Sequence, residues 1–439
     1  MAPKTLLKVL VDNQRLTYAA FDRLFTNTGD RLFGKGRGPT CGESQYRRWT
    51  GGRLKGLPGN KTCQVLEEMF GRKVEDLFSP PPPDSNLPAH TDNWEVEILM
   101  AAQEAHRDAD AFSASISDLT TDQLHDQIVS LARNYHMRPP HDVFRDVDHL
   151  RKEMERQRDR TRVPAQQQKL LVLCGQATAL LASAAFDLGS ITGARSLARA
   201  AALYGETARY EPLRAYADAT LAYLAYYAGE PYEAVTLTSR ALSYGGLGDV
   251  ARRRILAIQT RAHAHLGDDE STQRTMLMSD EVNTAARDDL HDDVGGEFSF
   301  PSDRMAMSHS TSAILIRDSS QAEAMASRAL DLLSQRPVAE RTLHVLGSAT
   351  ADLALSRLMA GNLDGAVEVM GPVWEIPGPQ RVTGVLMRLT RLRRYLAQSD
   401  YHGVVQAIDL AERIEDFQRT ATSAVNLLGH QAGILALEA

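Results

Sequence analysis

Over most of the chain, apolar residues recur every three or four positions, which is the spacing of one face of an α-helix. In the first eighty residues this spacing predicts five short helices, over Lys4–Leu10, Leu16–Phe25, Gly42–Thr50, Asn60–Phe70 and Val74–Phe78. Thr17 is placed to cap the second helix and Asn60 the fourth, because such short side chains accept hydrogen bonds from free backbone N–H groups. The sequence therefore predicts a small helical domain over residues 1–79.

Aromatic residues supply the expected core of this domain. The second helix carries an apolar stripe of Tyr18, Phe21, Leu24 and Phe25. Tyr46 and Trp49 of the third helix are expected to face the same core. The other face of the third helix is then left polar and exposed.

Prolines mark the end of the N-terminal domain. Pro80 to Pro83 and Pro88 cannot continue a helix, so residues 80–90 are expected to form a semi-rigid linker. Beyond it, helical patterns over Trp94–Phe112, Thr121–Tyr135 and Asp142 to about Arg160 predict connecting helices within residues 91–164.

From about Leu170 the chain repeats a helix, a short junction and a second helix. The junctions end at Gly189, Gly229, Gly267, Asp318, Gly361 and Ser399, at intervals of 40, 38, 51, 43 and 38 residues. Small residues recur at fixed offsets, including Ala182, Ala222 and Ala354, where they let two helices approach closely. We expect six antiparallel helix pairs within a domain spanning residues 165–439, with an extended loop in the 51-residue interval, which contains Gly295, Gly296 and Pro301.

This repeat resembles the tetratricopeptide repeat, although its intervals are longer than that unit of about 34 residues and the full consensus is absent. The resemblance implies a superhelix of stacked helical hairpins whose first helices line a concave face. The predicted fold class is therefore all-α, with an N-terminal five-helix domain followed by a superhelix of helical hairpins.

Composition agrees with a helical globular protein. Hydrophobic residues make up 43% of the 439 residues, charged residues 24% and aromatic residues 6%, which excludes global disorder. Three separated cysteines form neither a disulfide framework nor a zinc motif, so we expect a cytoplasmic protein. The longest uncharged stretch, residues 170–186, is too short and too rich in small residues for a membrane span, and is interpreted as a buried helix.

Charge is distributed unevenly along the chain. Residues 1–78 contain fourteen lysines and arginines against eight acidic residues, a net charge of +6 in a chain whose total is −7, so the remainder carries −13. Clustered cations favour a polyanion through counterion release, whereas the acidic remainder would be repelled. The sequence therefore predicts that only the N-terminal domain approaches nucleic acid.

Three segments carry a resemblance to the Cro/repressor-type, or xenobiotic-response-element, helix-turn-helix domain. They are Thr17-Tyr18 at the start of the second helix, Ser44 to Gly51 as the recognition helix, and Val74 to Phe78 as the closing element. The resemblance implies that the third helix enters the major groove, where Gln can pair with adenine and Arg with guanine. The expected DNA-contacting residues are Ser44, Gln45, Arg47, Arg48, Arg53, Lys55, Asn60, Lys61 and Thr62.

The chain departs from that family between its second and third helices. About fifteen residues, from Asn27 to Cys41, are expected there instead of a few, and they include Arg31, Lys35 and Arg37. The insertion could clamp DNA, or it could be a flexible loop. The cations around Asn60 have the alternative interpretation of a solvated loop.

Motifs for catalysis, metals and cofactors are weak. The segment from Gly29 to Gly36 resembles the motif of a phosphate-binding loop, but Gly36 occupies the position where that motif requires Ser or Thr. The acidic run from Asp288 to Asp293 is interpreted as a solvated connector rather than a metal site. No nucleophile lies in a recognisable motif. We therefore expect no enzyme activity, no metal and no cofactor.

The first helices of the repeats contain candidates for an effector groove. Carrying over the register of tetratricopeptide arrays places nine residues on the concave face: Gln176, Tyr216, Thr220, Tyr223, Tyr227, Arg254, Arg261, Arg304 and Ser308. The same register adds Ser183 and Asp352. Aromatic rings beside cations suit an extended peptide or a small molecule, although tyrosines at this spacing also build cores.

Several segments resemble a large set of bacterial regulators of development and secondary metabolism, with the architecture of peptide-sensing RRNPP regulators. They are Pro164 to Gln166, Ala185 to Gly189 and Leu213 to Tyr216. The resemblance implies a cytoplasmic transcription regulator that binds a palindromic operator in double-stranded DNA as a homodimer and senses a signalling peptide or small molecule, with no membrane partner. The alternative is a protein-interaction adaptor that does not bind DNA.

Overall fold

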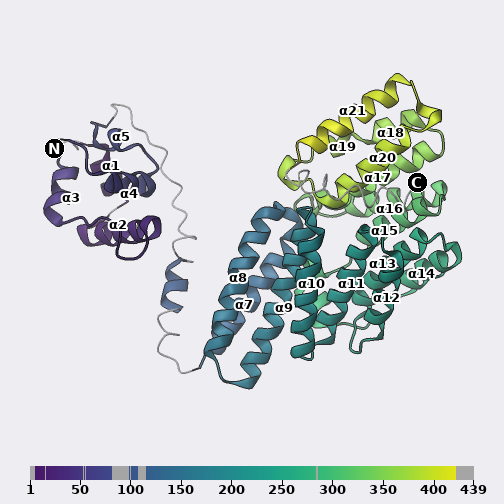
Figure 1. The fold of residues 1–439 in the computed structure, drawn as a ribbon, viewed down its shortest axis with the longest axis horizontal. Helices are drawn as coiled ribbons and strands as arrows, with labels where there is room; N and C mark the ends of the chain where they lie inside the picture. The colour runs from purple at the N-terminus through teal and green to yellow at the C-terminus, as the bar shows by residue number, and fades with distance from the viewer. Residues whose placement is uncertain are drawn as a thin grey trace. The chain divides into compact units, whose positions relative to one another are not determined.

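The computed structural model describes residues 5–14, 16–52, 54, 56–81, 98, 100–106, 115–282 and 285–421. Every regular element within these ranges is a helix or a helical turn, which confirms the predicted all-α class. The chain divides into two compact units, residues 1–103 and residues 104–439 (Figure 1).

Within residues 5–81, the part of the first unit that precedes residue 82, the described residues form five helices in the predicted order. They are α1 (Leu6–Asn13), α2 (Tyr18–Phe33), α3 (Glu43–Thr50), α4 (Asn60–Phe70) and α5 (Val74–Phe78). Thr17 caps α2 as predicted, its hydroxyl accepting from the backbone N–H of Ala20 at 3.3 Å. The prediction that Asn60 caps α4 is wrong, because Gly59 occupies the cap position and Asn60 is the first helical residue.

Helix α2 is longer than the sequence pattern predicted. It continues to Phe33, so the connection to α3 runs only from Gly34 to Gly42. Thr28 and Gly29 are buried in this extension, and Gly29 lies against Gly38 of the connection. The predicted insertion is therefore mostly an extra two turns of helix followed by a short segment packed against it.

Aromatic side chains form the core of the first unit. Phe21, Phe25 and Trp49 are at most 2% exposed, and the Trp49 ring lies 6.0 Å from that of Phe25. Leu24, which was predicted to join this stripe, is 39% exposed. Its side chain therefore lies largely outside this core.

The second unit begins with the helices that the sequence assigned to a connecting region. Helix α7 (Asp118–Arg133), the 3₁₀ turn η1 (Tyr135–Met137) and α8 (Pro140–Arg160) are described, whereas most of the predicted helix Trp94–Phe112 lies outside the described residues. Both α7 and α8 pack against α9 (Pro164–Asp187). This part of the connecting region is therefore continuous with the repeats in space.

Among the described residues, six helical hairpins follow, side by side (Figure 1). They pair α9 with α10 (Ile191–Thr207), α11 (Glu211–Tyr227) with α12 (Pro231–Ser243), α13 (Asp249–His265) with α14 (Asp269–Glu281), α15 (Ser302–Leu315) with α16 (Ser319–Ser334), α17 (Leu343–Met359) with α18 (Leu363–Val369) and α19 (Gly371–Trp374), and α20 (Thr383–Leu396) with α21 (Val405–Arg419). The short 3₁₀ turns η4 (Val338–Glu340), η5 (Gly378–Gln380) and η6 (Ser399–Tyr401) lie in loops between them.

Alanine sets the close approach of these helices. Ala182, Ala222 and Ala354, at the predicted contact positions of the first helices, are fully buried. Ala194 and Ala234 on second helices are also fully buried. A larger side chain at such a position would separate the two backbones, so the small-residue pattern and the hairpin architecture are directly linked.

The 51-residue interval holds two compact turns between α14 and α15. A single π-helical turn, η2 (Asp289–Val294), is followed by the 3₁₀ turn η3 (Gly296–Phe298). The prediction of a solvated acidic connector is wrong for two residues, because Asp288 is 7% and His291 2% exposed. Asp288 accepts from the backbone N–H groups of His291 and Gly248, which fixes the turn inside the unit.

Helix α9 is the one described helix that is long and apolar enough to cross a membrane. Within the unit, 78% of its most apolar window is buried. Helices α8 and α10 pack along it. This is the environment of a buried core helix, as the sequence predicted.

Candidate functional site

The first candidate site is the outer face of α3. Trp49 anchors this helix, and the hydroxyl of Thr5 donates to the Trp49 carbonyl at 3.4 Å. Tyr46 is partly buried and packs on Phe21, with ring centroids 4.9 Å apart. Both side chains therefore face the core as predicted, and their anchoring fixes which residues of α3 point outward.

The outward residues of α3 are polar and cationic. Ser44, Arg47 and Arg48 are exposed and Gln45 is partly exposed. A guanidinium nitrogen of Arg47 lies 2.6 Å from Glu43 Oε1, and Arg48 Nε donates to the Ser44 carbonyl at 3.2 Å. Such exposed interactions contribute little stability, so the arginines can exchange them for an external acceptor.

The other predicted DNA contacts surround the start of α4. Asn60 and Lys61 are exposed, and Lys61 Nζ lies 5.2 Å from the centre of the Phe33 ring. The Thr62 side chain is only 9% exposed and faces inward, so its backbone N–H is the group left for a phosphate. Arg53 and Lys55 lie outside the described residues.

The connection between α2 and α3 adds cations near α4. The backbone N–H of Gly36 donates to Asp30 Oδ1 at 2.8 Å, which fastens the connection to the end of α2. Lys35 and Arg37 on it are exposed. Lys61 Nζ donates to the Arg37 carbonyl at 3.4 Å, so the connection and the first turn of α4 are adjacent.

The second candidate site is a cavity of about 70 Å³ inside the second unit. Side chains from the first helices of five consecutive hairpins, α9, α11, α13, α15 and α17, line it. Six of the nine predicted effector residues are among them: Thr220, Tyr223, Arg254, Arg261, Arg304 and Ser308. Ser183, which the repeat register also placed on this face, lines the cavity as well.

Three predicted effector residues do not line the cavity. Tyr216 is 1% exposed and lies behind the wall, where its hydroxyl donates to Glu297 Oε1 at 3.2 Å. Tyr227 accepts from the Tyr223 hydroxyl at 3.3 Å. Gln176 is 3% exposed within α9. Asp352, the remaining residue from the repeat register, is buried away from the cavity against Arg388 at 3.1 Å.

Glu297 is the central residue of the cavity that sequence reasoning missed. Its Oε1 accepts from Ser183 at 3.0 Å, and its Oε2 lies 2.8 Å from His136 Nε2 and 3.2 Å from Arg304 Nη1. Turn η3 thereby spans the concave face and connects α9, η1 and α15. The only sequence signal for this residue was its place in the long interval, which identified a loop but not its direction.

The other residues that the sequence did not indicate are His136, His344 and Asp187. The rings of His136 and His344 stack with centroids 5.7 Å apart. Tyr135 donates a hydrogen bond of 2.8 Å to Asp187 Oδ2. His136 comes from the turn after α7 and His344 from α17, so the cavity joins the start of the second unit to its fifth hairpin.

Burial and neighbouring charges set the ionisation of the cavity acids in opposite directions. Burial raises the pKa of Glu297. The nearby Arg304 and His136 lower it by a larger amount, so the pKa of Glu297 is well below the ordinary range. Burial and the charge of Glu297 raise the pKa of Asp187 to about 7. Burial also lowers the pKa of His344, as do His136 and Arg304. At neutral pH, Glu297 is therefore ionised and His344 is neutral, whereas Asp187 keeps its proton to a higher pH than an ordinary carboxyl group does.

A wider and more open hollow of about 580 Å³ lies beside η2 and η3. Arg133, Arg253 and Arg336 line it, and Arg336 is paired with Asp303 at 2.8 Å. Phe300 borders both this hollow and the inner cavity. The ring of Phe300 therefore forms part of the wall between the two spaces.

Comparison with known proteins adds no assignment: no protein-family model matches the chain, and no curated protein matches it significantly.

Proposed function

We propose that the protein is a sequence-specific DNA-binding transcription regulator whose second unit senses an effector. The observation that carries the proposal is the outer face of α3, where Gln45, Arg47 and Arg48 project from a helix anchored by Trp49. Gln and Arg are the side chains that read adenine and guanine edges with paired hydrogen bonds. A short helix fixed in this way suits the major groove.

Charge supports the same proposal. The net charge of +6 on residues 1–78 contrasts with −13 on the remainder. Lys35, Arg37 and Lys61 add exposed cations to the same unit as α3. Phosphate contacts of this kind position a protein on DNA, while the residues of α3 supply the sequence preference.

The effector part of the proposal rests on the cavity. It brings together polar, cationic and aromatic residues from five hairpins, and seven of these residues were predicted from the repeat register. Effector binding there would stabilise one arrangement of these hairpins relative to another, which is the requirement for a ligand-operated switch. The cavity is lined partly by the chain's own η3 turn, so we favour a small molecule over an extended peptide as effector.

A mobility-shift measurement on the DNA upstream of its own coding sequence tests DNA binding. We expect the affinity to fall steeply with salt, because lysines and arginines release counterions. The double variant Gln45→Ala/Arg47→Ala should weaken specific binding by about 30-fold or more, since each good base contact contributes about 1–3 kcal/mol.

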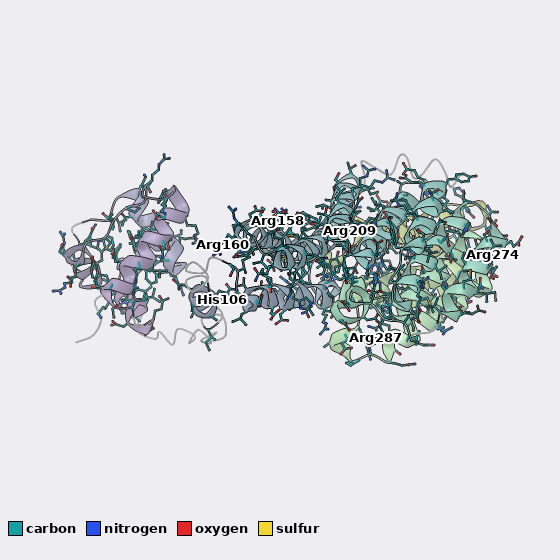
Figure 2. The ribbon with its side chains drawn as sticks, turned by 90° about the horizontal axis from the view of Figure 1, so that it is seen from below. His106, Arg158, Arg160, Arg209, Arg274 and Arg287 are labelled. Atoms are coloured by element: carbon teal, nitrogen blue, oxygen red, sulfur yellow. The ribbon has the colours of Figure 1, made fainter. Side chains whose placement is uncertain are left out.

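The matched control is Arg274→Ala. Arg274 lies on α14 at the outer edge of the second unit (Figure 2) and its side chain is 59% exposed. This change removes one positive charge without touching α3, so DNA binding should be retained. Absence of binding at low salt, or an unchanged affinity in the double variant, would contradict the proposal and favour an interaction adaptor without DNA binding.

We also propose that the regulator is a homodimer, because one short recognition helix reads only a few base pairs and a palindromic operator requires two. Native mass spectrometry should then show a species of twice the chain mass of 48.3 kDa. A purely monomeric protein that still binds the operator tightly would contradict this part.

A further inference from the structure

Two arginines on one face of α13 enter the inner cavity. Arg254 and Arg261 are seven residues apart, which places them about two helical turns from each other on the same side. Their side chains belong to residues that are 6% and 3% exposed, and both line the cavity. Buried cations in this position require a counter-charge or another polar environment.

Two other arginines in the interior of the second unit have a carboxylate partner. Arg388 Nε lies 3.1 Å from Asp352 Oδ2, and Arg304 Nη1 lies 3.2 Å from Glu297 Oε2. Within the described part of the chain, Arg261 has neither an ion pair nor a hydrogen bond, and Arg254 has only a hydrogen bond of 3.2 Å to Thr220. Because an unpaired buried charge is strongly unfavourable, this arrangement leaves a place for an anion.

An aromatic ring lies near each of the two guanidinium groups. Arg254 lies 4.2 Å from the centre of the Tyr216 ring, and Arg261 lies 5.7 Å from that of Tyr223. Such a cation–π contact is not a hydrogen bond and gives the N–H groups of the guanidinium no acceptor. Three buried nitrogens, Arg254 Nη1, Arg261 Nε and Arg304 Nε, have no acceptor among the described residues.

The charge of the cavity wall favours an anion. Three arginines line the cavity against two carboxyl groups, Glu297 and Asp187. Glu297 is already engaged by Ser183 and Arg304, and Tyr135 donates to Asp187. Neither carboxylate is bonded to Arg254 or Arg261, so the positive charge of α13 is not neutralised by a direct partner.

The remaining wall is apolar. Phe186, Leu224, Ile258, Phe300 and Met307 line the cavity together with the arginines. A cavity of about 70 Å³ has room for about five water-sized groups, which corresponds to a ligand of about five to eight non-hydrogen atoms. The wall therefore matches an anionic head joined to a short apolar body.

We propose that the inner cavity binds a small organic monocarboxylate, whose carboxylate is held by Arg254 and Arg261 and whose hydrocarbon part packs against the apolar wall. This inference rests on the proposed function, since it names the chemical class of the effector. Inorganic phosphate satisfies the arginines but leaves the apolar side chains without a partner.

Calorimetric titration of the full-length protein with butyrate tests the inference, at constant ionic strength and without DNA. Butyrate should bind with an affinity in about the millimolar range, as expected for a ligand of six non-hydrogen atoms. Butyramide, which has the same shape without the charge, should bind at least about tenfold more weakly. Inorganic phosphate should bind more weakly than butyrate.

Variants locate the site. Arg261→Met removes the charge but keeps an unbranched side chain, and should weaken butyrate binding by about 10- to 100-fold, the range for a lost charge-assisted hydrogen bond. Arg261→Lys keeps the charge without the planar donors and should bind with intermediate affinity. The matched control Arg274→Met, on the outer edge of the unit, should bind butyrate as the wild type does.

Four outcomes would overturn the inference: no butyrate binding, equal binding of butyramide, stronger binding of phosphate, or unchanged binding in Arg261→Met. Its failure is separable from that of the proposed regulator, because the titration contains no DNA. If the protein binds butyrate but no operator, the carboxylate site is supported and the proposed regulator is contradicted. If it binds an operator but no butyrate, the proposed regulator is supported and the carboxylate site is contradicted.

Discussion

Arg261 and Arg388 are buried to nearly the same extent, but their surroundings differ. Arg388 is paired with Asp352 and also donates to the Thr311 hydroxyl at 2.9 Å. Among the described residues, Arg261 has no ion pair or hydrogen bond and lies near the ring of Tyr223. The structural role of a buried charge depends on whether its partner is supplied by the protein, so equal burial does not mean equal contribution to stability.

Substitution of these two arginines by methionine should have different effects on the stability of the ligand-free protein. Arg388→Met leaves Asp352 as a buried carboxylate with one remaining hydrogen bond from Thr311, and should lower the free energy of unfolding by about 3–5 kcal/mol. Arg261→Met removes an unpaired charge and should leave that free energy unchanged or raise it by up to about 2 kcal/mol. Urea unfolding of both variants measures the difference. Equal destabilisation would show that Arg261 is compensated within the protein.

Asp187 should make the stability of the second unit pH-dependent. Its pKa rises from 3.8 to about 7 on folding, chiefly because of burial and secondly because of Glu297. Between about pH 4 and pH 7 the folded protein therefore retains a proton that the unfolded chain releases, and this carboxyl lowers stability as the pH rises.

Asp187→Asn should remove that contribution, while its amide oxygen still accepts from Tyr135. We expect the variant to be more stable than the wild type by about 4 kcal/mol at pH 8, because each unit of the pKa change corresponds to about 1.4 kcal/mol, and to differ little at pH 4. Urea unfolding at several pH values gives the comparison. A difference that does not change with pH would contradict the raised pKa.

At the level of secondary-structure elements, the connection between α2 and α3 is held by close backbone packing. A Cβ atom on Gly38 would lie 2.9 Å from the carbonyl carbon of Gly29. That contact is with backbone of α2, which cannot rotate away. The short connection therefore depends on glycine at this position, and it determines where α3 begins.

Gly38→Ala should destabilise the first unit by about 1–3 kcal/mol, because the connection must shift away from α2. Gly56→Ala is the matched control, since a Cβ atom on Gly56 would meet nothing within 4 Å. Hydrogen exchange at the amides of α2 and α3 reports the effect. Equal protection in the two variants would mean that the connection adapts without cost.

At the level of the whole second unit, η2 and η3 link helices that are far apart in the sequence. Arg133 of α7 donates to the carbonyls of Asp293 and Val294 at 2.7 and 3.2 Å. Glu297 bonds to Ser183 of α9 and Arg304 of α15. The segment formed by η2 and η3 therefore bridges α7, α9 and α15, and it also forms one wall of the cavity.

Gly296→Ala should disrupt the packing of η2 and η3 against α7. Gly296 has φ +64°, and a Cβ atom on it would lie 2.2 Å from the Ala132 carbonyl oxygen. Gly267→Ala is a matched control, because Gly267 has a similar φ of +70° but open space around its Cβ position.

In Gly267→Ala the free energy of unfolding should fall by only about 1 kcal/mol, because alanine is strained in a left-handed backbone conformation. In Gly296→Ala it should fall by at least about 3 kcal/mol. Hydrogen exchange should accelerate across α7 in Gly296→Ala and remain unchanged there in Gly267→Ala. Similar exchange in both variants would show that backbone conformation, and not the contact with α7, accounts for the loss.

Local regularities of the sequence predicted the helices and their pairing. One regularity is the spacing of apolar side chains every three or four residues, which describes the buried face of a single helix. The other is the recurrence of alanine, at Ala182, Ala222 and Ala354, which describes the packing of a helix against its neighbour. These properties depend on residues close in the sequence, so the hairpins could be anticipated. The end of α2 could not, because the burial of Gly29 depends on a later segment that folds back on it.

The sequence by itself determined the helical class, the hairpin repeats and the difference in net charge between the cationic residues 1–78 and the acidic rest of the chain. The tertiary structure decided which concave-face residues meet in a cavity, because η3 inserts Glu297 among them and His136 arrives from before the repeats. It also decided that Arg388 is paired with Asp352, whereas Arg261 has no ion pair among the described residues. The physical reason is that the electrostatic environment of a buried side chain is made by segments distant in the sequence, whose approach no local pattern encodes.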